Sequence, residues 1–181
     1  NLAFLNFERY QSWKKPTKPS GDARQAVFAF QGDVYQGLEA ATMKKGDLNF
    51  AQKHLRILSG LYGVLKPLDL MAPYRLEMGT KLATKKHDDL YGFWKDTLTA
   101  DINAQLAEQK DSTLINLASN EYFNALNKKD IVGKIVSPVF KDFKNGDYKI
   151  ISFFAKKARG MMARYIIDNK VTNPDGLADF N

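Results

Sequence analysis

The sequence IVSPVFKDFKNGDYKIISFFAKKARGMMARYIIDNK, residues 135–170, places two short apolar runs on either side of an Asn-Gly pair. The runs are residues 135–140 and 148–154, and the pair is Asn145-Gly146. Asn-Gly between such runs favours a β-hairpin, because both central positions of its tight turn need a positive φ. The stretch therefore predicts two antiparallel strands that are joined at residues 144–147.

An amphipathic helix is predicted directly after the second strand. Five residues recur at spacings of 3, 4, 7 and 8 and share one apolar face: Ala158, Met161, Met162, Tyr165 and Ile166. Lys157 and Arg164 lie seven residues apart on a different face. Lys156 and Arg159 are expected in the first turn, where the helix dipole disfavours cations by a few tenths of a kcal/mol. This placement weakly indicates an anionic partner.

The positive charge of the chain is concentrated in the same region. The formal net charge is +7, and residues 128–170 contain 11 Lys and Arg against 4 Asp and Glu, whereas the rest of the chain carries 16 of each. A run of charge is commonly just a solvated face, and it is also the electrostatic signature of a nucleic-acid or phosphate-binding surface. The sequence leaves both interpretations open.

The composition is typical of a soluble globular protein, with 44% hydrophobic and 26% charged residues in 181. No apolar run approaches the eighteen residues of a transmembrane helix, and no segment resembles a signal peptide. The chain has no cysteine, which fits a reducing cytosol and excludes disulfides and thiolate ligands. Its two histidines are 33 positions apart. We therefore expect a cytoplasmic protein without a metal site, cofactor or membrane contact.

The remaining pattern alternates short apolar strands with helices. We expect a helix over residues 1–15 with Asn6 as a possible N-cap, followed by a basic, flexible loop over residues 14–22. Buried strands are predicted at residues 25–30, 56–65 and 113–118, and helices at residues 48–55, capped by Asp47, and 88–109. On the last helix, helical spacing predicts these core residues: Leu90, Phe93, Trp94, Thr97, Leu98, Ile102 and Leu106. The fold class that this order predicts is α/β or mixed α+β, as a single domain with a mixed sheet flanked by helices and a C-terminal hairpin and helix.

Polar residues inside the apolar motifs are candidates for a binding cleft. Asp33 follows a predicted strand, where it could bind a ligand or simply start a helix. Arg75 and Glu77 would share one side of an extended segment, as a ligand pair or as a plain ion pair. The candidate catalytic carboxylates are Asp33, Glu77 and Glu121, and the other polar-cleft candidates are Tyr35, Arg75, Asn116 and Ser119.

Several stretches together closely resemble the bacterial YaaA family of peroxide-stress proteins. They are AFQGDVY (29–35), LSGLYGVLKPLDLMAPYRLEMG (58–79), LYGFW (90–94), NLASNEYF (116–123) and ISFFAKKARGMMARYII (151–167). The resemblance implies a cytosolic protein that helps cells survive hydrogen peroxide, limits damage from unincorporated iron and binds double-stranded DNA. It also implies a mixed α/β fold with a positively charged cleft and a helix-hairpin-helix element.

The chain departs from the family pattern at its ends. The family's N-terminal segment, with a first strand and a Ser-Pro-Ala-Lys motif, and its C-terminal tail do not appear here. We therefore predict one YaaA-like domain over residues 1–181 that is incomplete at both ends. Residues 2–6 match the position of the family's hairpin, but Phe4 stands where a glycine is expected, and only the second helix, up to Trp13, is included.

Two functional hypotheses follow. In the first, the protein binds double-stranded DNA through its phosphates, without sequence preference, and affinity falls steeply with salt. The candidate contacts are Lys156, Lys157, Arg159 and Arg164, supported by Lys14, Lys15 and Lys18. In the second, it is an enzyme that acts on a nucleotide-like or other phosphate-bearing small molecule in the polar cleft, with Lys156 as a further candidate for acid–base chemistry. Direct iron chelation is not expected, since no acidic cluster has metal-ligand spacing.

Overall fold

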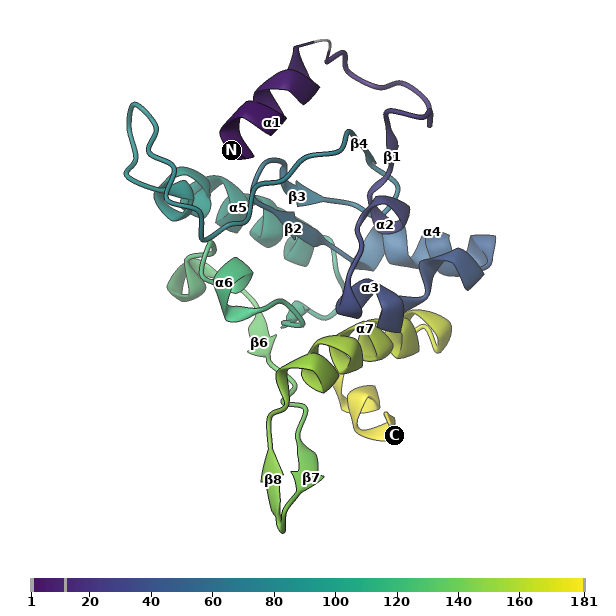
Figure 1. The fold of residues 1–181 in the computed structure, drawn as a ribbon. Helices are drawn as coiled ribbons and strands as arrows, with labels where there is room; N and C mark the ends of the chain where they lie inside the picture. Colours follow the sequence, from purple (N-terminus) through teal and green to yellow (C-terminus); the bar gives the residue numbers. More distant parts are fainter. Residues whose placement is uncertain (1, 12, 181) are drawn as a thin grey trace.

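The computed structural model describes residues 2–11 and 13–180 and shows a mixed α/β protein (Figure 1). The helices are α1 (Leu2–Tyr10), α2 (Ala26–Ala29), α3 (Asp33–Leu38), α4 (Lys45–His54), α5 (Leu90–Ala107), α6 (Asn120–Phe123) and α7 (Ser152–Asp168). The strands are β1 (Arg24–Gln25), β2 (Ile57–Ser59), β3 (Gly63–Leu65), β4 (Leu70–Met71), β5 (Thr113–Ile115), β6 (Lys134–Val136), β7 (Asp142–Lys144) and β8 (Asp147–Lys149). Short 3₁₀ helices are η1 (Ala40–Thr42), η2 (Lys128–Asp130) and η3 (Pro174–Asp179). The predicted fold class is confirmed.

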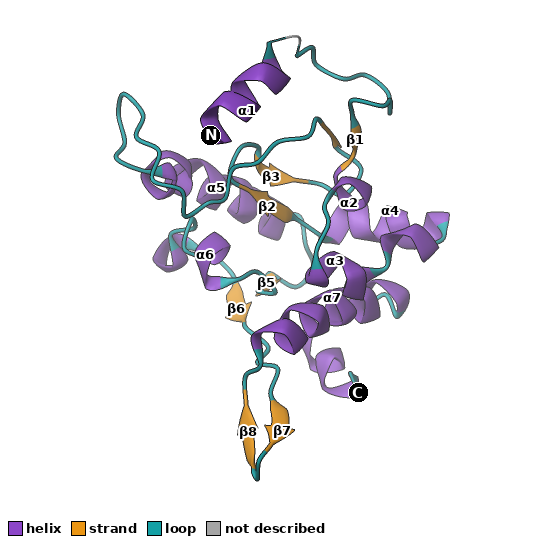
Figure 2. Ribbon diagram, in the orientation of Figure 1, coloured by secondary structure: helices purple, strands orange, loops and turns teal. Residues whose placement is uncertain are grey.

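The strands pair two by two. β1 pairs with β4, β2 with β3 and β7 with β8, all antiparallel, whereas β5 and β6 are parallel. The helices flank these small sheets, as Figure 2 shows. Among the described residues the strands form these four pairs, so the sheet content that the sequence predicted is divided into pieces of two strands.

The predicted hairpin is confirmed, with shorter strands than expected. Asn145 and Gly146 have φ values of 55° and 80°, as a tight hairpin turn of this kind requires. The first predicted strand was placed too early, because the backbone of residues 134–136 pairs with β5 instead of with the hairpin. The second was extended too far, because α7 already begins at Ser152.

Two hydrophobic clusters form the core. One joins α2, α3, α4, β2 and α7, and its most buried members include Ala26, Val27 and Ile167. The other surrounds α5, where the predicted core positions Leu90, Leu98, Ile102 and Leu106 are all buried. Core positions on a long helix were therefore predictable from the 3.6-residue period.

Two aromatic residues of α5, Phe93 and Trp94, differ in how far they are buried. Phe93 is 44% exposed, so its assignment to the core was wrong. Trp94 is half-buried, and its indole N–H donates to the carbonyl oxygen of Gly60 at 2.9 Å. Its ring lies against Gly63, where a Cβ would come within 2.7 Å of the ring. Gly63 has a φ of 73°, so both the turn and the close ring require glycine.

Helices α3 and α7 cross at very short range, as Figure 1 shows. A Cβ on Gly160 would lie 2.8 Å from the backbone nitrogen of Leu38, and one on Gly37 would lie 3.0 Å from the backbone nitrogen of Met161. Because α7 packs on α3 through Gly160, the face that it buries differs from the predicted one. Its buried residues are Ala155, Gly160, Met162, Ala163 and Ile167. The predicted apolar face was therefore partly wrong: Met161 is 44% exposed.

Three further local predictions need correction. Residues 25–30 form only the end of β1 and then α2, whose first N–H groups, those of Ala26 and Val27, donate to the loop carbonyls of Asp69 and Pro67. Helix α4 begins at Lys45, and Asp47 lies inside its first turn, where it accepts a hydrogen bond from the Lys44 N–H at 3.1 Å.

Asn6 lies in the middle of α1 and is not its N-cap. Its side chain accepts from the Arg75 N–H at 3.0 Å and donates to the Arg75 carbonyl at 2.7 Å, which docks α1 on the 74–77 segment. Residues 1 and 12 of the predicted N-terminal helix lie outside the described residues.

Candidate functional site

The predicted DNA-binding cations on α7 fall into two groups. Lys156 and Lys157 are exposed and Arg159 is half-exposed, and none of the three forms an ion pair within the described part of the chain. The first turn of α7 is residues 152–155, so the prediction that Lys156 and Arg159 lie in the first turn was wrong. The unfavourable effect of the helix dipole on cations is confined to the first turn and does not reach them. The crossing with α3 fixes the backbone of α7 and leaves these side chains free for solvent or a ligand.

Arg164, by contrast, has internal partners. Its Nε donates to both carboxylate oxygens of Asp168, at 2.8 and 2.7 Å. One terminal N–H group donates to the carbonyl oxygen of Glu39 at 3.0 Å and to the hydroxyl of Thr42 at 2.6 Å. These acceptors follow the C-terminal end of α3, where carbonyl groups lack helical partners and a cation is favoured. In this structure Arg164 therefore joins α7 to α3 and η1.

The supporting lysines Lys14, Lys15 and Lys18 lie in the loop between α1 and β1 and are exposed. In Figure 1 this loop is at the top of the molecule, whereas α7 and the β7–β8 hairpin are at the bottom. The two groups of cations that the sequence proposed for one ligand are therefore not brought together.

Two of the polar residues proposed for a cleft, Arg75 and Glu77, lie together. Arg75 and Glu77 form an exposed ion pair at 3.6 Å and line a cavity of about 460 Å³ together with Phe30, Tyr74 and Tyr122. Of the three candidate carboxylates, only that of Glu77 lines this cavity.

The other carboxylates have different surroundings. Asp33 is the first residue of α3, in the position of a helix-starting residue. Glu121 accepts a hydrogen bond from the backbone N–H of Gly79 at 2.9 Å, which fixes the turn after residue 78. The described residues therefore do not place Asp33, Glu77 and Glu121 along one cavity wall.

The tyrosines around this cavity are held in the neutral form. Tyr35 stacks on Phe30 with ring centroids 5.3 Å apart, and burial, followed by the neighbouring Tyr74 and Tyr122, raises the pKa of Tyr35. Burial raises the pKa of Tyr122 to about 12, with smaller contributions from Tyr74 and Glu121. Neutral phenols at physiological pH provide aromatic walls and hydrogen-bond donors, and they do not act as phenolate bases.

Asn116 and Ser119 have local structural contacts. The Asn116 side chain accepts from the Ala118 N–H at 3.1 Å and donates to the Ser137 hydroxyl at 3.3 Å. Ser119 occupies the N-cap position of α6, although its hydroxyl makes no capping hydrogen bond. Both residues shape the turn from β5 into α6.

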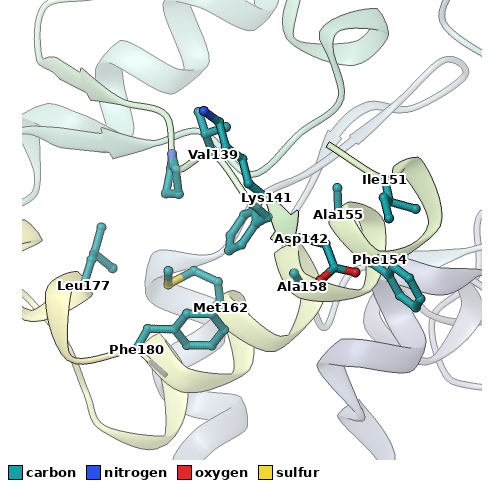
Figure 3. Close-up of a pocket in the computed structure, with 12 residues that line it drawn as sticks. Val139, Lys141, Asp142, Ile151, Phe154, Ala155, Ala158, Met162, Leu177 and Phe180 are labelled. Atoms are coloured by element: carbon teal, nitrogen blue, oxygen red, sulfur yellow. The ribbon is translucent and has the colours of Figure 1, made fainter. Parts of the chain in front are cut away.

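A second cavity, of about 420 Å³, lies at the base of the hairpin (Figure 3). α7 contributes Phe154, Ala158 and Met162, and the C-terminal segment contributes Leu177 and Phe180. Lys141 and Asp142 are its charged lining residues. Its other lining residues have apolar side chains.

Exposed aromatic residues around the hairpin were missing from the sequence-based candidates. Phe143 is 62%, Tyr148 65%, Phe153 54% and Phe154 52% exposed. The Asn-Gly turn fixes the hairpin register, so the pairing of Phe143 with Tyr148 on one face could have been derived from the sequence.

No group of three or more His, Asp or Glu side chains suited to a metal ion occurs in residues 2–11 and 13–180. No helix in the same residues is long and apolar enough to cross a bilayer.

Comparison with known proteins gives consistent matches along the chain. The family described as "Peroxide stress protein YaaA" matches residues 1–181. A UPF0246 protein of Shewanella woodyi is 60% identical over 180 residues, which is 99% of this chain and 70% of the relative. A UPF0246 protein of Teredinibacter turnerae is 56% identical over the same shares.

Proposed function

This chain belongs to the family of the peroxide stress protein YaaA, which indicates a role in the response to peroxide, and we propose that it performs this role by binding double-stranded DNA in the cytoplasm. The binding surface is the hairpin–α7 surface, defined as residues 141–159. Contacts go to phosphates, so binding has no strong sequence preference.

The observation that carries this proposal is the distribution of charge after folding. The hairpin–α7 surface contains six Lys and Arg and two Asp. Of these, Lys156 and Lys157 are exposed neighbours on a rigid helix, without an ion-pair partner in the described residues. Two basic residues further along the chain have internal partners: Arg164 on α7 binds Asp168, and Lys170, after the end of α7, binds Asp47. Within residues 141–170, the cations that remain available to a polyanion therefore lie before Arg164, with Lys156 and Lys157 at the beginning of α7.

The test compares two double charge reversals in the whole chain. Lys156→Glu with Lys157→Glu changes the proposed surface, and Lys85→Glu with Lys86→Glu is the matched control, because those lysines are also adjacent and exposed. Binding to a labelled duplex is measured across a series of salt concentrations. Each lost phosphate contact lowers the salt slope by about 1, so we expect the first variant to lose about 2 from the slope and at least about tenfold in affinity.

The control variant should stay within about threefold of the original protein at moderate salt, because it has the same net charge as the test variant but leaves the surface intact. Equal losses in both variants would refute the placement of the interface. Absence of duplex binding by the unmodified chain would refute DNA binding itself.

We place protection against unincorporated iron downstream of DNA binding. The described residues offer no cluster of carboxylates or histidines with metal-binding geometry. Protein bound to the DNA would limit the damage that iron causes to the nucleic acid. A variant that no longer binds DNA should then also lose protection in peroxide-treated cells, and full protection by such a variant would contradict this link.

A second candidate function is an enzyme acting on a nucleotide-like or phosphate-bearing small molecule. The cavity lined by Arg75, Glu77, Tyr74 and Tyr122 favours it, because it combines aromatic walls with one cation and one carboxylate. Thermal shift measurements with mononucleotides and inorganic phosphate test it. A stabilisation that Arg75→Ala removes would support this function, and no shift with any of these ligands would refute it.

A further inference from the structure

Large exposed apolar side chains gather around the hairpin. Fourteen such side chains occur among the described residues, and seven of them lie between residues 139 and 161. A concentration of exposed apolar side chains on a folded protein commonly marks a binding surface. Five of the seven belong to the hairpin–α7 surface, which also carries the free lysines.

The hairpin itself has two different faces. Phe143 lies directly opposite Tyr148, with ring centroids 5.2 Å apart, so one face is aromatic. In the backbone register Asp142 is the partner of Lys149, and Lys144 is the partner of Asp147. The hairpin projects from the body of the protein in Figure 1. An isolated two-stranded hairpin is only marginally stable in water. It is therefore unusual that no other part of the protein covers the aromatic face of this hairpin, where Phe143 and Tyr148 are exposed.

A second aromatic pair continues this surface at the start of α7. Phe153 and Phe154 have ring centroids 5.7 Å apart, and both are more than half exposed. Figure 3 shows Phe154 at the edge of the cavity at the base of the hairpin. Lys156 and Lys157 follow within one turn. Four exposed aromatic rings are thus followed, a short distance along the chain, by two free ammonium groups.

This combination selects the chemistry of the ligand. The core of a protein–protein interface is depleted of lysine, and the phosphates of an intact duplex do not require aromatic partners. Unpaired nucleic acid needs both groups, since cations neutralise its backbone and exposed rings stack on its bases. We propose that the aromatic face of the hairpin stacks on unpaired bases of a DNA strand while Lys156 and Lys157 contact the adjacent phosphates.

This inference rests on the proposed DNA binding and adds a preference to it. The duplex is bound through phosphates alone, whereas a single-stranded or locally opened segment gains stacking on Phe143 and Tyr148. Replacement of a stacking aromatic by alanine weakens binding by about 1–3 kcal/mol per base, which corresponds to about 5-fold to 150-fold. The preference is independent of base identity, because every base has a π face.

The test uses the whole chain with Phe143→Ala and Tyr148→Ala. Binding is measured to a labelled oligothymidine strand and to a duplex of equal length. We expect at least about tenfold weaker binding to the strand and a change below about threefold on the duplex. Because both side chains are exposed, the melting temperature should stay close to that of the original protein, and this is checked on the same samples.

Two matched variants separate stacking from general apolar contact. Phe143→Leu with Tyr148→Leu keeps apolar side chains but removes the rings, and it should resemble the alanine variant. Phe143→Trp with Tyr148→Trp keeps the rings, should restore strand binding, and should show quenching of tryptophan fluorescence when the strand binds.

Each contrary outcome overturns a defined part of the account. Unchanged strand binding by the alanine variant, equal losses on strand and duplex, or full retention by the leucine variant would overturn base stacking by the hairpin. If the original protein binds the duplex but not the strand, this inference fails and the proposed function stands. If it binds neither, both fail.

Discussion

The glycine contact between α3 and α7 gives a prediction whose size can be worked out from the structure. In Gly160→Ala the new Cβ would lie 2.8 Å from the Leu38 nitrogen and closer still to the Val34 carbonyl oxygen, well below an ordinary contact of 3.4–4 Å. Both neighbours are backbone atoms and cannot rotate away, so the two helices must separate. Separation would also stretch the hydrogen bonds from Arg164 to Glu39 and Thr42.

Overpacking of this kind costs about 1–3 kcal/mol, and weakening hydrogen bonds from a charged group costs about 1.5–3 kcal/mol. The higher helix propensity of alanine returns about 1 kcal/mol. We therefore expect a net loss of about 2–4 kcal/mol in the free energy of unfolding. For a domain of this size, that loss corresponds to a melting temperature about 5–15 °C lower.

The assay is urea unfolding followed by circular dichroism, with Gly46→Ala as the control. Gly46 is an exposed glycine of α4, and a Cβ there would meet no atom within 4 Å. The control should therefore be neutral or more stable by up to about 1 kcal/mol. If Gly160→Ala is as stable as the control, the close helix crossing is refuted, and with it the account of how α7 is positioned.

Three further predictions concern single side chains. Arg164→Met should lower the free energy of unfolding by about 2 kcal/mol or more in the same assay, because carbonyls at the end of α3 lose their partner; a loss below about 0.5 kcal/mol would contradict its structural role. A hydrogen bond from Lys170, and after it one from a backbone N–H, lowers the pKa of Asp47. The ionised Asp47 carboxylate therefore stabilises the folded protein above its ordinary pKa near 4, and this stabilisation is lost as the pH falls through the lowered pKa. Asp47→Asn should flatten the stability curve below about pH 4, and an unchanged curve would refute this. Trp94→Ala should destabilise by about 3 kcal/mol and Phe93→Ala by less, because the indole is half-buried and hydrogen-bonded, whereas the Phe93 ring, which packs edge-on against Trp94, is 44% exposed; equal losses would contradict the exposure of Phe93.

Local sequence signals predicted those elements that depend on local chemistry. The Asn145-Gly146 turn was predictable because few residue pairs adopt two consecutive positive φ angles. The core face of α5 was predictable because a helix of eighteen residues repeats the 3.6-residue period several times. Residues 25–30 were wrongly predicted as a strand because a short apolar run fits a buried strand and a buried helix equally well.

The candidate site depended more on contacts between distant residues. No local pattern reveals that Arg164 reaches acceptors more than 120 positions away, or that Gly160 lies against α3. For the same reason, a list of cations drawn from the sequence mixed Arg164, which has internal partners, with Lys156 and Lys157, which are free. The pairing of Arg75 with Glu77 was predictable because both residues lie on one extended segment.

The most direct test of the account is hydrogen–deuterium exchange of the whole chain with and without a short DNA duplex. The account predicts slower exchange in peptides covering residues 141–159, with little change in the loop that contains Lys14, Lys15 and Lys18. Slower exchange confined to α1 and that loop, or no change at saturating DNA, would contradict the claim that the hairpin–α7 surface binds DNA.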